Sequence, residues 1–182
     1  MLKTMLISLA LVASAPVAVA GQNDATSAEA LVSSAAFDIA QSEQARVADA
    51  VLSHIDTDAI ARFTLGRHGR TLAANDRARF KAAYEAFLRR QIEANAHQFS
   101  GVEVNVVDTA ARNARDAIVT TEIRRGSEPL KVRWRVIERS GKWSVVDLEV
   151  AGIWLAIEQR AQVAAILGRP GADIEDVIAQ LG

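Results

Sequence analysis

The sequence predicts an α+β domain in which helices come first, strands second and further helices last. Apolar residues recur at helical spacing before Gly101, and the longest such stripe runs from about Asn75 to Gln98. After Gly101 the apolar period changes from about four residues to two, which is typical of strands that bury one face. Helical spacing returns at Ile153. This order predicts one domain built on an antiparallel sheet.

The first twenty residues have the pattern of a secretory signal peptide, with Lys3, an apolar run from Met5 to Val12, and a small-residue site at Ala18-Val19-Ala20. Cleavage after Ala20 would leave residues 21–182 as a single exported domain, and an uncleaved anchor is the alternative. The chain has no cysteine, which excludes thiol chemistry, and a net charge of −1. That charge argues against binding to nucleic acid.

Three helices are predicted before the long one, over residues 27–37, 43–55 and 56–65. Thr26 or Ser27 can cap the first of them, and Asp56 the third, because their side-chain oxygens can accept free backbone N–H groups. The glycines and basic residues of the segment 66–70 then bend the chain.

The long helix carries an aromatic inner face. Its apolar residues fall on one stripe at helical spacing: Phe80, Tyr84, Phe87, Leu88, Ile92 and Phe99. Arg77, Lys81 and Glu85 lie mainly off that stripe, so the helix is amphipathic. Aromatic stripes usually fill ordinary core, and the wall of an apolar cavity is the alternative.

Four strands are predicted, over residues 102–106, 116–124, 130–137 and 143–150. Arg125-Gly126-Ser127 and Ser140-Gly141 supply the chemistry of turns. One face of the last hairpin should carry Leu130, Val132, Trp134 and Val136 from its first strand, and Val146, Leu148 and Val150 from its second. Asp147 and Glu149 should then face solvent. The helix that begins at Ile153 is expected to lie across the hairpin's apolar face.

The spacing of polar residues gives no positive evidence for an enzyme. His54-x-Asp56-x-Asp58 can be read as a metal cluster, but a helix end followed by capping aspartates explains it. His68 lies in a basic bend, and His97 lies near a helix end where a cation is favourable. Asp147 and Glu149 form a conceivable carboxylate pair. There is no Gly-x-Ser-x-Gly elbow, Gly-rich phosphate loop or H-E-x-x-H motif. We therefore expect no catalysis, no metal and no cofactor.

Several strings, in this order, carry a family resemblance: Phe63-Thr64-Leu65-Gly66, Arg79-Phe80 to Phe87-Leu88, Trp143-Ser144-Val145-Val146-Asp147-Leu148, Gly152-Ile153, Leu155, Arg160, and the terminal Ile174 to Leu181. On these strings the chain resembles the MlaC or toluene-tolerance family of periplasmic phospholipid-binding proteins. It departs from the family pattern at Gly69, Trp154, Gln159 and Val163.

The resemblance implies a curved four-stranded antiparallel sheet wrapped by helices, NTF2-like or cystatin-like, that encloses an apolar cavity. It also implies a soluble, monomeric periplasmic lipid carrier. Such a carrier binds phospholipid acyl chains and exchanges lipid between an outer-membrane lipoprotein–porin complex and an inner-membrane ABC transporter with an MCE-domain subunit, which maintains outer-membrane lipid asymmetry. The alternatives are a hopanoid-associated or other apolar-ligand binder of the same family, a small periplasmic enzyme on an NTF2-like scaffold, and a structural adaptor with a solid core.

The expected cavity residues come from the helix stripe, the hairpin and the last junction: Phe63, Leu65, Phe80, Tyr84, Phe87, Leu88, Ile92, Val132, Trp134, Val136, Val146, Leu148, Ile153, Trp154 and Leu155. Arg67, His68 and Arg70 form a basic turn that is expected to meet the lipid headgroup or an acidic partner. The ring of Trp154 either lines or seals the cavity, or belongs to the surface or the ordinary core.

Overall fold

The computed structural model describes residues 20–99, 102–124 and 129–182. The helices are α1 (Ala20–Gln41), α2 (Val47–His54), α3 (Thr57–Leu65), α4 (Ala74–Ala94), α5 (Leu155–Leu167) and α6 (Ile174–Leu181). Short 3₁₀ turns are η1 (Gln44–Arg46), η2 (His68–Arg70) and η3 (Ala96–Gln98), and the strands are β1 (Glu103–Asn113), β2 (Asp116–Arg124), β3 (Pro129–Arg139), β4 (Lys142–Val150) and β5 (Ile153–Trp154). The predicted signal peptide, residues 1–20, lies outside the described residues except for Ala20, where α1 begins.

The sheet has five strands in the order β1-β2-β3-β4-β5, and each strand is antiparallel to its neighbour. The prediction of four strands is wrong because Ile153 and Trp154 pair with β4 before the helix begins. Ala151 and Gly152 make the tight turn between β4 and β5 with φ angles of 51° and 83°. Glycine adopts this left-handed conformation at little cost. The turn predicted at residues 125–127 lies outside the described residues.

A register shift in β4 changes which side chains face inward. Arg135 pairs with Asp147 but Val136 pairs with Val145, so Val146 is an extra residue in the ladder. Val145 is therefore fully buried, whereas Val146 is only half-buried. The predicted alternation through Val146 is wrong for this reason, because a bulge moves one residue out of register.

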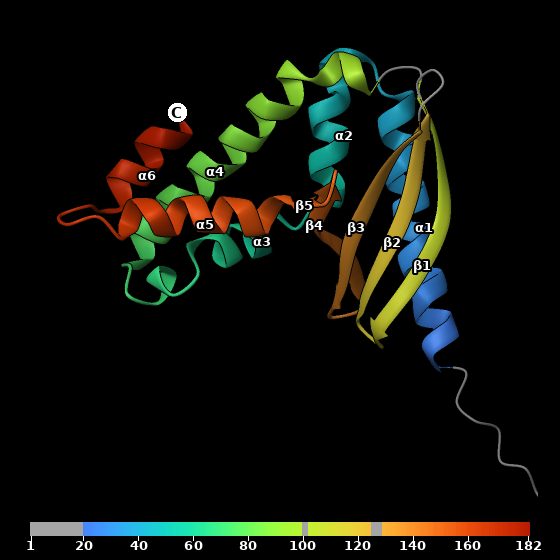
Figure 1. The fold of residues 1–182 in the computed structure, drawn as a ribbon, viewed down its shortest axis with the longest axis horizontal. Helices are drawn as coiled ribbons and strands as arrows, with labels where there is room; N and C mark the ends of the chain where they lie inside the picture. The colour runs from blue at the N-terminus through green and yellow to red at the C-terminus, as the bar shows by residue number, and fades with distance from the viewer. Residues whose placement is uncertain (1–19, 100–101, 125–128) are drawn as a thin grey trace, which may run out of the picture.

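The sheet body, which consists of α1, α2 and the five strands, has its own core. Helix α1 runs behind β1 and β2 (Figure 1), and α2 packs beside it. Val132, Trp134 and Val136 of β3 are buried in this core, as the alternation predicted. Trp134 Nε1 donates a hydrogen bond of 2.9 Å to Thr121 Oγ1, so its polar atom is satisfied.

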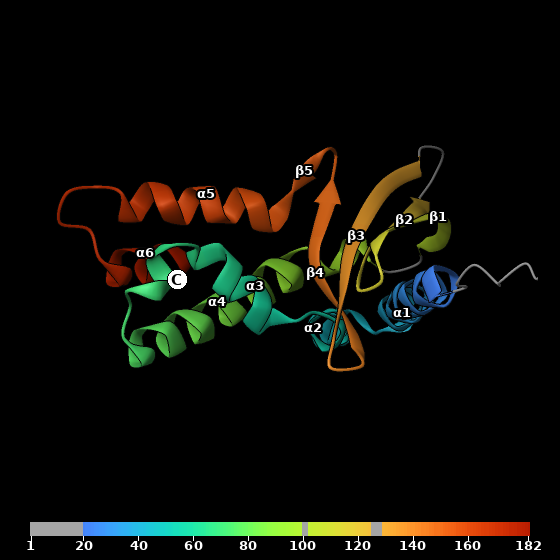
Figure 2. The same ribbon diagram turned by 90° about the horizontal axis from the view of Figure 1, so that it is seen from below.

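The helical body, which consists of α3, α4, α5 and α6, has a second and separate core around Phe80 and Tyr84. Helix α4 therefore buries its aromatic face mainly against other helices, and its sheet-side end joins the first core through Ile92, followed by Ala96 of η3. Helix α5 extends away from the sheet (Figures 1 and 2). The expectation that it crosses the apolar face of the hairpin is wrong, because α1 and α2 already cover that face.

Candidate functional site

An apolar pocket lies where the helical body meets the edge of the sheet. Helices α4 and α5 flank it, and α3 and β4 close it. We call it the junction pocket. Its wall is formed by Ile55, Ile60, Tyr84, Leu88, Val145, Asp147, Leu148, Leu155, Ala156 and Gln159. The cavity volume is about 70 Å³. Most of the wall is aliphatic, so the polar atoms of its remaining residues decide what the pocket accepts.

Asp147 places a carboxylate at this wall. Its Oδ1 atom accepts the backbone N–H groups of Leu148 and Ala156, each over 2.8 Å. Ala156 lies in the first turn of α5, whose own N-cap residue, Trp154, offers no side-chain acceptor. Asp147 therefore caps α5 from the sheet. Burial raises the pKa of this carboxyl group, while its two N–H donors and Arg135 oppose the rise.

Tyr84 and Gln159 join the two sides of the pocket. The hydroxyl of Tyr84 on α4 donates a hydrogen bond to Gln159 Oε1 on α5. Tyr84 is only 1% exposed, and burial raises the pKa of its phenol to about 12, so it stays protonated and remains a donor. Its ring stacks on Phe80 at 5.7 Å between centroids. The pair thus gives one end of an apolar pocket a satisfied polar contact.

Polar links hold the two bodies together at Asp56. Its backbone N–H donates to the carbonyl of Val145 over 2.9 Å, beside a parallel bridge between Ile55 and Val145. The carboxylate of Asp56 accepts the N–H of Ala59 at 2.8 Å, which confirms the predicted cap of α3. Its second oxygen lies 2.7 Å from Arg139 Nη1 at the end of β3. Further links join the two bodies, because Ile55 packs against both cores and Arg89 Nη1 of α4 lies 2.7 Å from Asp49 Oδ1 of α2.

An exposed apolar rim adjoins the pocket at the start of α5. Ile153, Leu155 and Ile157 are 54%, 41% and 53% exposed, and Leu155 also lines the pocket. Ile157 follows Leu155 by two residues and so points to another side of α5, whereas Leu155 connects the pocket with this exposed apolar surface. The rim therefore extends the apolar character of the pocket to the protein surface.

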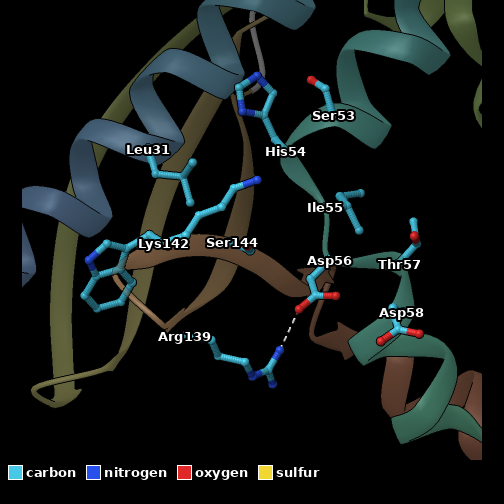
Figure 3. Close-up of a pocket in the computed structure, with 11 residues that line it drawn as sticks. Leu31, Ser53, His54, Ile55, Asp56, Thr57, Asp58, Arg139, Lys142 and Ser144 are labelled. Atoms are coloured by element: carbon cyan, nitrogen blue, oxygen red, sulfur yellow. Dashed lines mark hydrogen bonds and ion pairs between the residues drawn. The ribbon is translucent and has the colours of Figure 1, made fainter.

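A larger groove of about 370 Å³ lies on the other side of Ile55, between α1, α2 and the β3–β4 turn. Figure 3 shows Arg139, Asp56, Asp58 and Lys142 around it, with the Arg139–Asp56 pair across its opening. These charges make it unsuitable for an acyl chain. His54 Nε2 lies 2.9 Å from Asp38 Oδ2. Within the described residues no group of three or more His, Asp or Glu side chains could hold a metal ion.

The structure distributes the predicted cavity residues over several places. Tyr84, Leu88, Leu148 and Leu155 line the junction pocket. Leu65 and Phe80 lie in the helical core, and Ile92, Val132, Trp134 and Val136 lie in or against the sheet core. The others, namely Phe63, Phe87, Val146, Ile153 and Trp154, do not line the pocket. Phe63 instead stacks under the Arg160 guanidinium, 4.9 Å from its ring centroid.

Trp154 lies outside the pocket. Its side chain is half-buried, and the guanidinium of Arg133 lies 5.4 Å from its ring centroid. Glu149, which pairs with Trp154 across the strands, lies 2.6 Å from the same arginine. Trp154 thus belongs to the charged face of the sheet, where cation–π contacts are common.

The predicted basic turn forms η2 at the end of α3. Arg67 and Arg70 are exposed, and His68 lines a different groove that also includes Glu175 at the start of α6. The N-terminal half of α3, through Ile60, lines the junction pocket instead. The turn is therefore not part of the pocket wall.

Sequence reasoning missed six wall residues: Ile55, Ile60, Val145, Asp147, Ala156 and Gln159. The alternation of β4 predicts that Asp147 faces solvent, but it is only 7% exposed because the start of α5 covers it. The signal that could have found it is the uncapped start of α5. Trp154 and Leu155 cannot accept a backbone N–H through their side chains, so an acceptor from elsewhere was needed.

A family model described as MlaC protein matches residues 27–182, and the chain therefore belongs to the MlaC family, which confirms the resemblance. Among solved structures, this chain is similar to the phospholipid-binding protein from Ralstonia solanacearum in complex with a phospholipid. The TM-score is 0.73 at 16% sequence identity, over 87% of this chain and 94% of that chain. At this identity the match shows the α+β fold alone, and the NTF2-like and cystatin-like labels stay predictions. A comparison with curated proteins found no match.

Proposed function

We propose that this protein binds phospholipid acyl chains in the junction pocket and carries lipid through water. The observation that supports this most is the position of the pocket, between two separately packed cores and beside an exposed apolar rim. The chain's membership of the MlaC family and its fold likeness to a phospholipid-bound protein support the same function.

The pocket must widen to take an acyl chain. Its volume of about 70 Å³ is about half that of an engineered cavity of about 150 Å³ that binds benzene, so a whole acyl chain does not fit. Each methylene group removed from water contributes about 0.8 kcal/mol, so a whole acyl chain can offset the loss of several polar contacts. To move from the sheet edge, the helical body must release Ile92 of α4 from the sheet core, while Phe80 and Tyr84 keep their own packing within the helical core. We propose that lipid binding opens the junction in this way.

A binding role fits the polar atoms of the pocket better than catalysis does. The Asp147 oxygen described above is occupied by two backbone N–H groups, and the Tyr84 hydroxyl by Gln159. The second oxygen of Asp147 has no His, Ser, Thr or Lys side chain beside it in the pocket wall with which to share a proton, as general acid–base catalysis commonly requires. The lipid carrier therefore ranks above the small enzyme.

The cellular role follows the family. We propose that the protein is exported to the periplasm as a monomer, and that it exchanges phospholipid between an outer-membrane lipoprotein–porin complex and an inner-membrane ABC transporter with an MCE-domain subunit. Among the described helices, none has the length and apolar character needed to cross a bilayer. Because MlaC-type carriers leave the headgroup near solvent, the lipid phosphate should remain outside the apolar rim.

Native mass spectrometry of the purified protein, followed by lipid extraction, tests the proposal. We expect bound phospholipid, and uptake of phospholipid from vesicles by protein that has been stripped of lipid. Ala156→Leu should reduce uptake because it fills the pocket, whereas Ala164→Leu on the exposed side of α5 is the matched control. A hopanoid in the extract would support the alternative ligand. Repeated lipid-free preparations that take up no lipid would contradict the proposed function.

A further inference from the structure

The Tyr84–Gln159 hydrogen bond lies at one defined end of the junction pocket. Along α4, the residues after Tyr84 lead through Leu88 to Ile92, which packs on the sheet core. Helix α5 starts at the sheet, so Leu155 lies nearer to the strands than Gln159. The pair is therefore at the end that faces the helical core, and Leu88 and Leu155 lie on the sheet side.

Beyond this hydrogen bond lie the buried side chains of the helical core, including Phe80 of α4 and Val163 of α5. An acyl chain that extends toward Phe80 must pass between the Tyr84 hydroxyl and the Gln159 amide. Separating them leaves the Gln159 amide against hydrocarbon and leaves the Tyr84 hydroxyl with only the Thr64 side chain as a partner, which is unfavourable. A polar contact in an otherwise aliphatic wall is thus a barrier to further methylene groups.

We infer that the Tyr84–Gln159 hydrogen bond is a stop that limits the length of acyl chain the pocket accepts. The inference rests on the proposed function and adds a specificity determinant to it. Ligands whose chains end before the stop gain affinity with each added methylene, and longer chains gain nothing further.

A chain-length series tests the stop. The probes are saturated lysophosphatidylcholines of increasing length, each below its critical micelle concentration, titrated into lipid-free protein by calorimetry. The affinity of the wild-type protein should rise about fourfold per methylene and then reach a plateau. In the double variant Tyr84→Phe/Gln159→Leu the rise should continue to longer chains. Removing both partners together leaves no unpaired group, so the fold should be retained.

Further variants distinguish a failure of the stop from a failure of lipid binding itself. Tyr84→Phe alone is a milder variant that should also move the plateau, and Gln162→Leu changes an exposed glutamine of α5 and should not. An unchanged plateau in both the double variant and Tyr84→Phe would overturn the stop while leaving lipid binding intact. A wild-type protein that binds none of the probes would overturn the proposed function, and the stop with it.

Discussion

The Oδ1 atom of Asp147 on β4 accepts the backbone N–H of Ala156 in the first turn of α5 over 2.8 Å. One carboxylate thus fixes the direction in which α5 leaves the sheet and forms part of the pocket wall. The helix whose start it caps also carries Leu155 and Gln159 of the pocket wall. The position of the pocket therefore depends on this contact.

Replacing Asp147 should destabilise the lipid-free protein. Asp147→Ala removes the acceptor for two backbone N–H groups, and the loss of a helix cap costs about 1–2 kcal/mol. Chemical denaturation measures this change in the free energy of unfolding. Glu149→Gln, on the same strand and half-buried beside Arg133, is the control. Equal stability of the alanine variant and the wild type would contradict the capping role.

Asp147 should also give stability a distinct pH dependence. Burial raises its folded-state pKa above the ordinary value of 3.8, so the folded protein binds more protons than the unfolded chain between these two pKa values. Its contribution to stability is therefore present below the ordinary value and is lost as pH rises through the folded pKa. Asp147→Asn lacks this titration. The unfolding free energy of the wild type relative to Asp147→Asn should fall as pH rises across this window, and a constant difference would exclude the effect.

Breaking the Arg139–Asp56 pair should make the junction open more readily. Arg139 lies in the sheet body, and Asp56 caps the first helix of the helical body. An exposed ion pair contributes about 0–1 kcal/mol, so Arg139→Ala should hardly change stability but should speed lipid uptake from vesicles. Arg115→Ala removes a pair with Glu138 that lies wholly within the sheet body. If both variants take up lipid at the wild-type rate, the pair does not restrain the junction.

Trp154 should not determine which lipids bind. Its ring lies beside Arg133 outside the pocket, so Trp154→Ser should leave the bound lipid set unchanged. This substitution should also lower the free energy of unfolding by less than the loss of about 3–5 kcal/mol that is typical when a fully buried tryptophan is truncated. Leu155→Ser, at the next residue, should weaken lipid binding because Leu155 lines the pocket. New or bulkier acyl chains in the Trp154→Ser protein, identified by mass spectrometry, would show that the ring does occupy lipid space.

The basic turn should act on docking and not on lipid binding. Arg67 and Arg70 are exposed on the helical body, away from the pocket wall. Charge reversal at both positions should slow lipid transfer to anionic acceptor vesicles, and more so at low ionic strength, while lipid affinity stays unchanged. Arg46→Glu, an exposed charge reversal in η1 beside the sheet body, is the control. Equal transfer rates at low salt would remove the turn from the mechanism.

The sequence predicted the elements better than their packing. Strand β2 has the predicted bounds, and Asp56 caps α3 as expected, because turn chemistry and alternation are local signals. The aromatic stripe of α4 predicted that one face of the helix is buried, but it did not predict which elements pack against that face, because an apolar helix face can pack on other helices or on a sheet. For this reason Phe80 was assigned to a cavity wall but lies in a helical core.

Two local features of the structure, a bulge and a tight turn, explain why the sequence did not predict most of the pocket wall. The bulge at Val146 shifts the inward positions of β4, and one residue of shift reverses the face of each side chain. The β4–β5 turn at Ala151 and Gly152 then brings α5 over Asp147. Ala156 and Gln159 reach the pocket only through this turn, so helical periodicity alone could not identify them.

The most direct test of the account is photocrosslinking with a phospholipid that carries a photoreactive group within one acyl chain. After uptake from vesicles and irradiation, mass spectrometry locates the modified residues. If the junction pocket holds the acyl chain, the modifications should concentrate on pocket residues such as Leu88, Leu148 and Leu155. Modification confined to the polar groove around Lys142 and Arg139, or to the charged face of the sheet, would contradict the account.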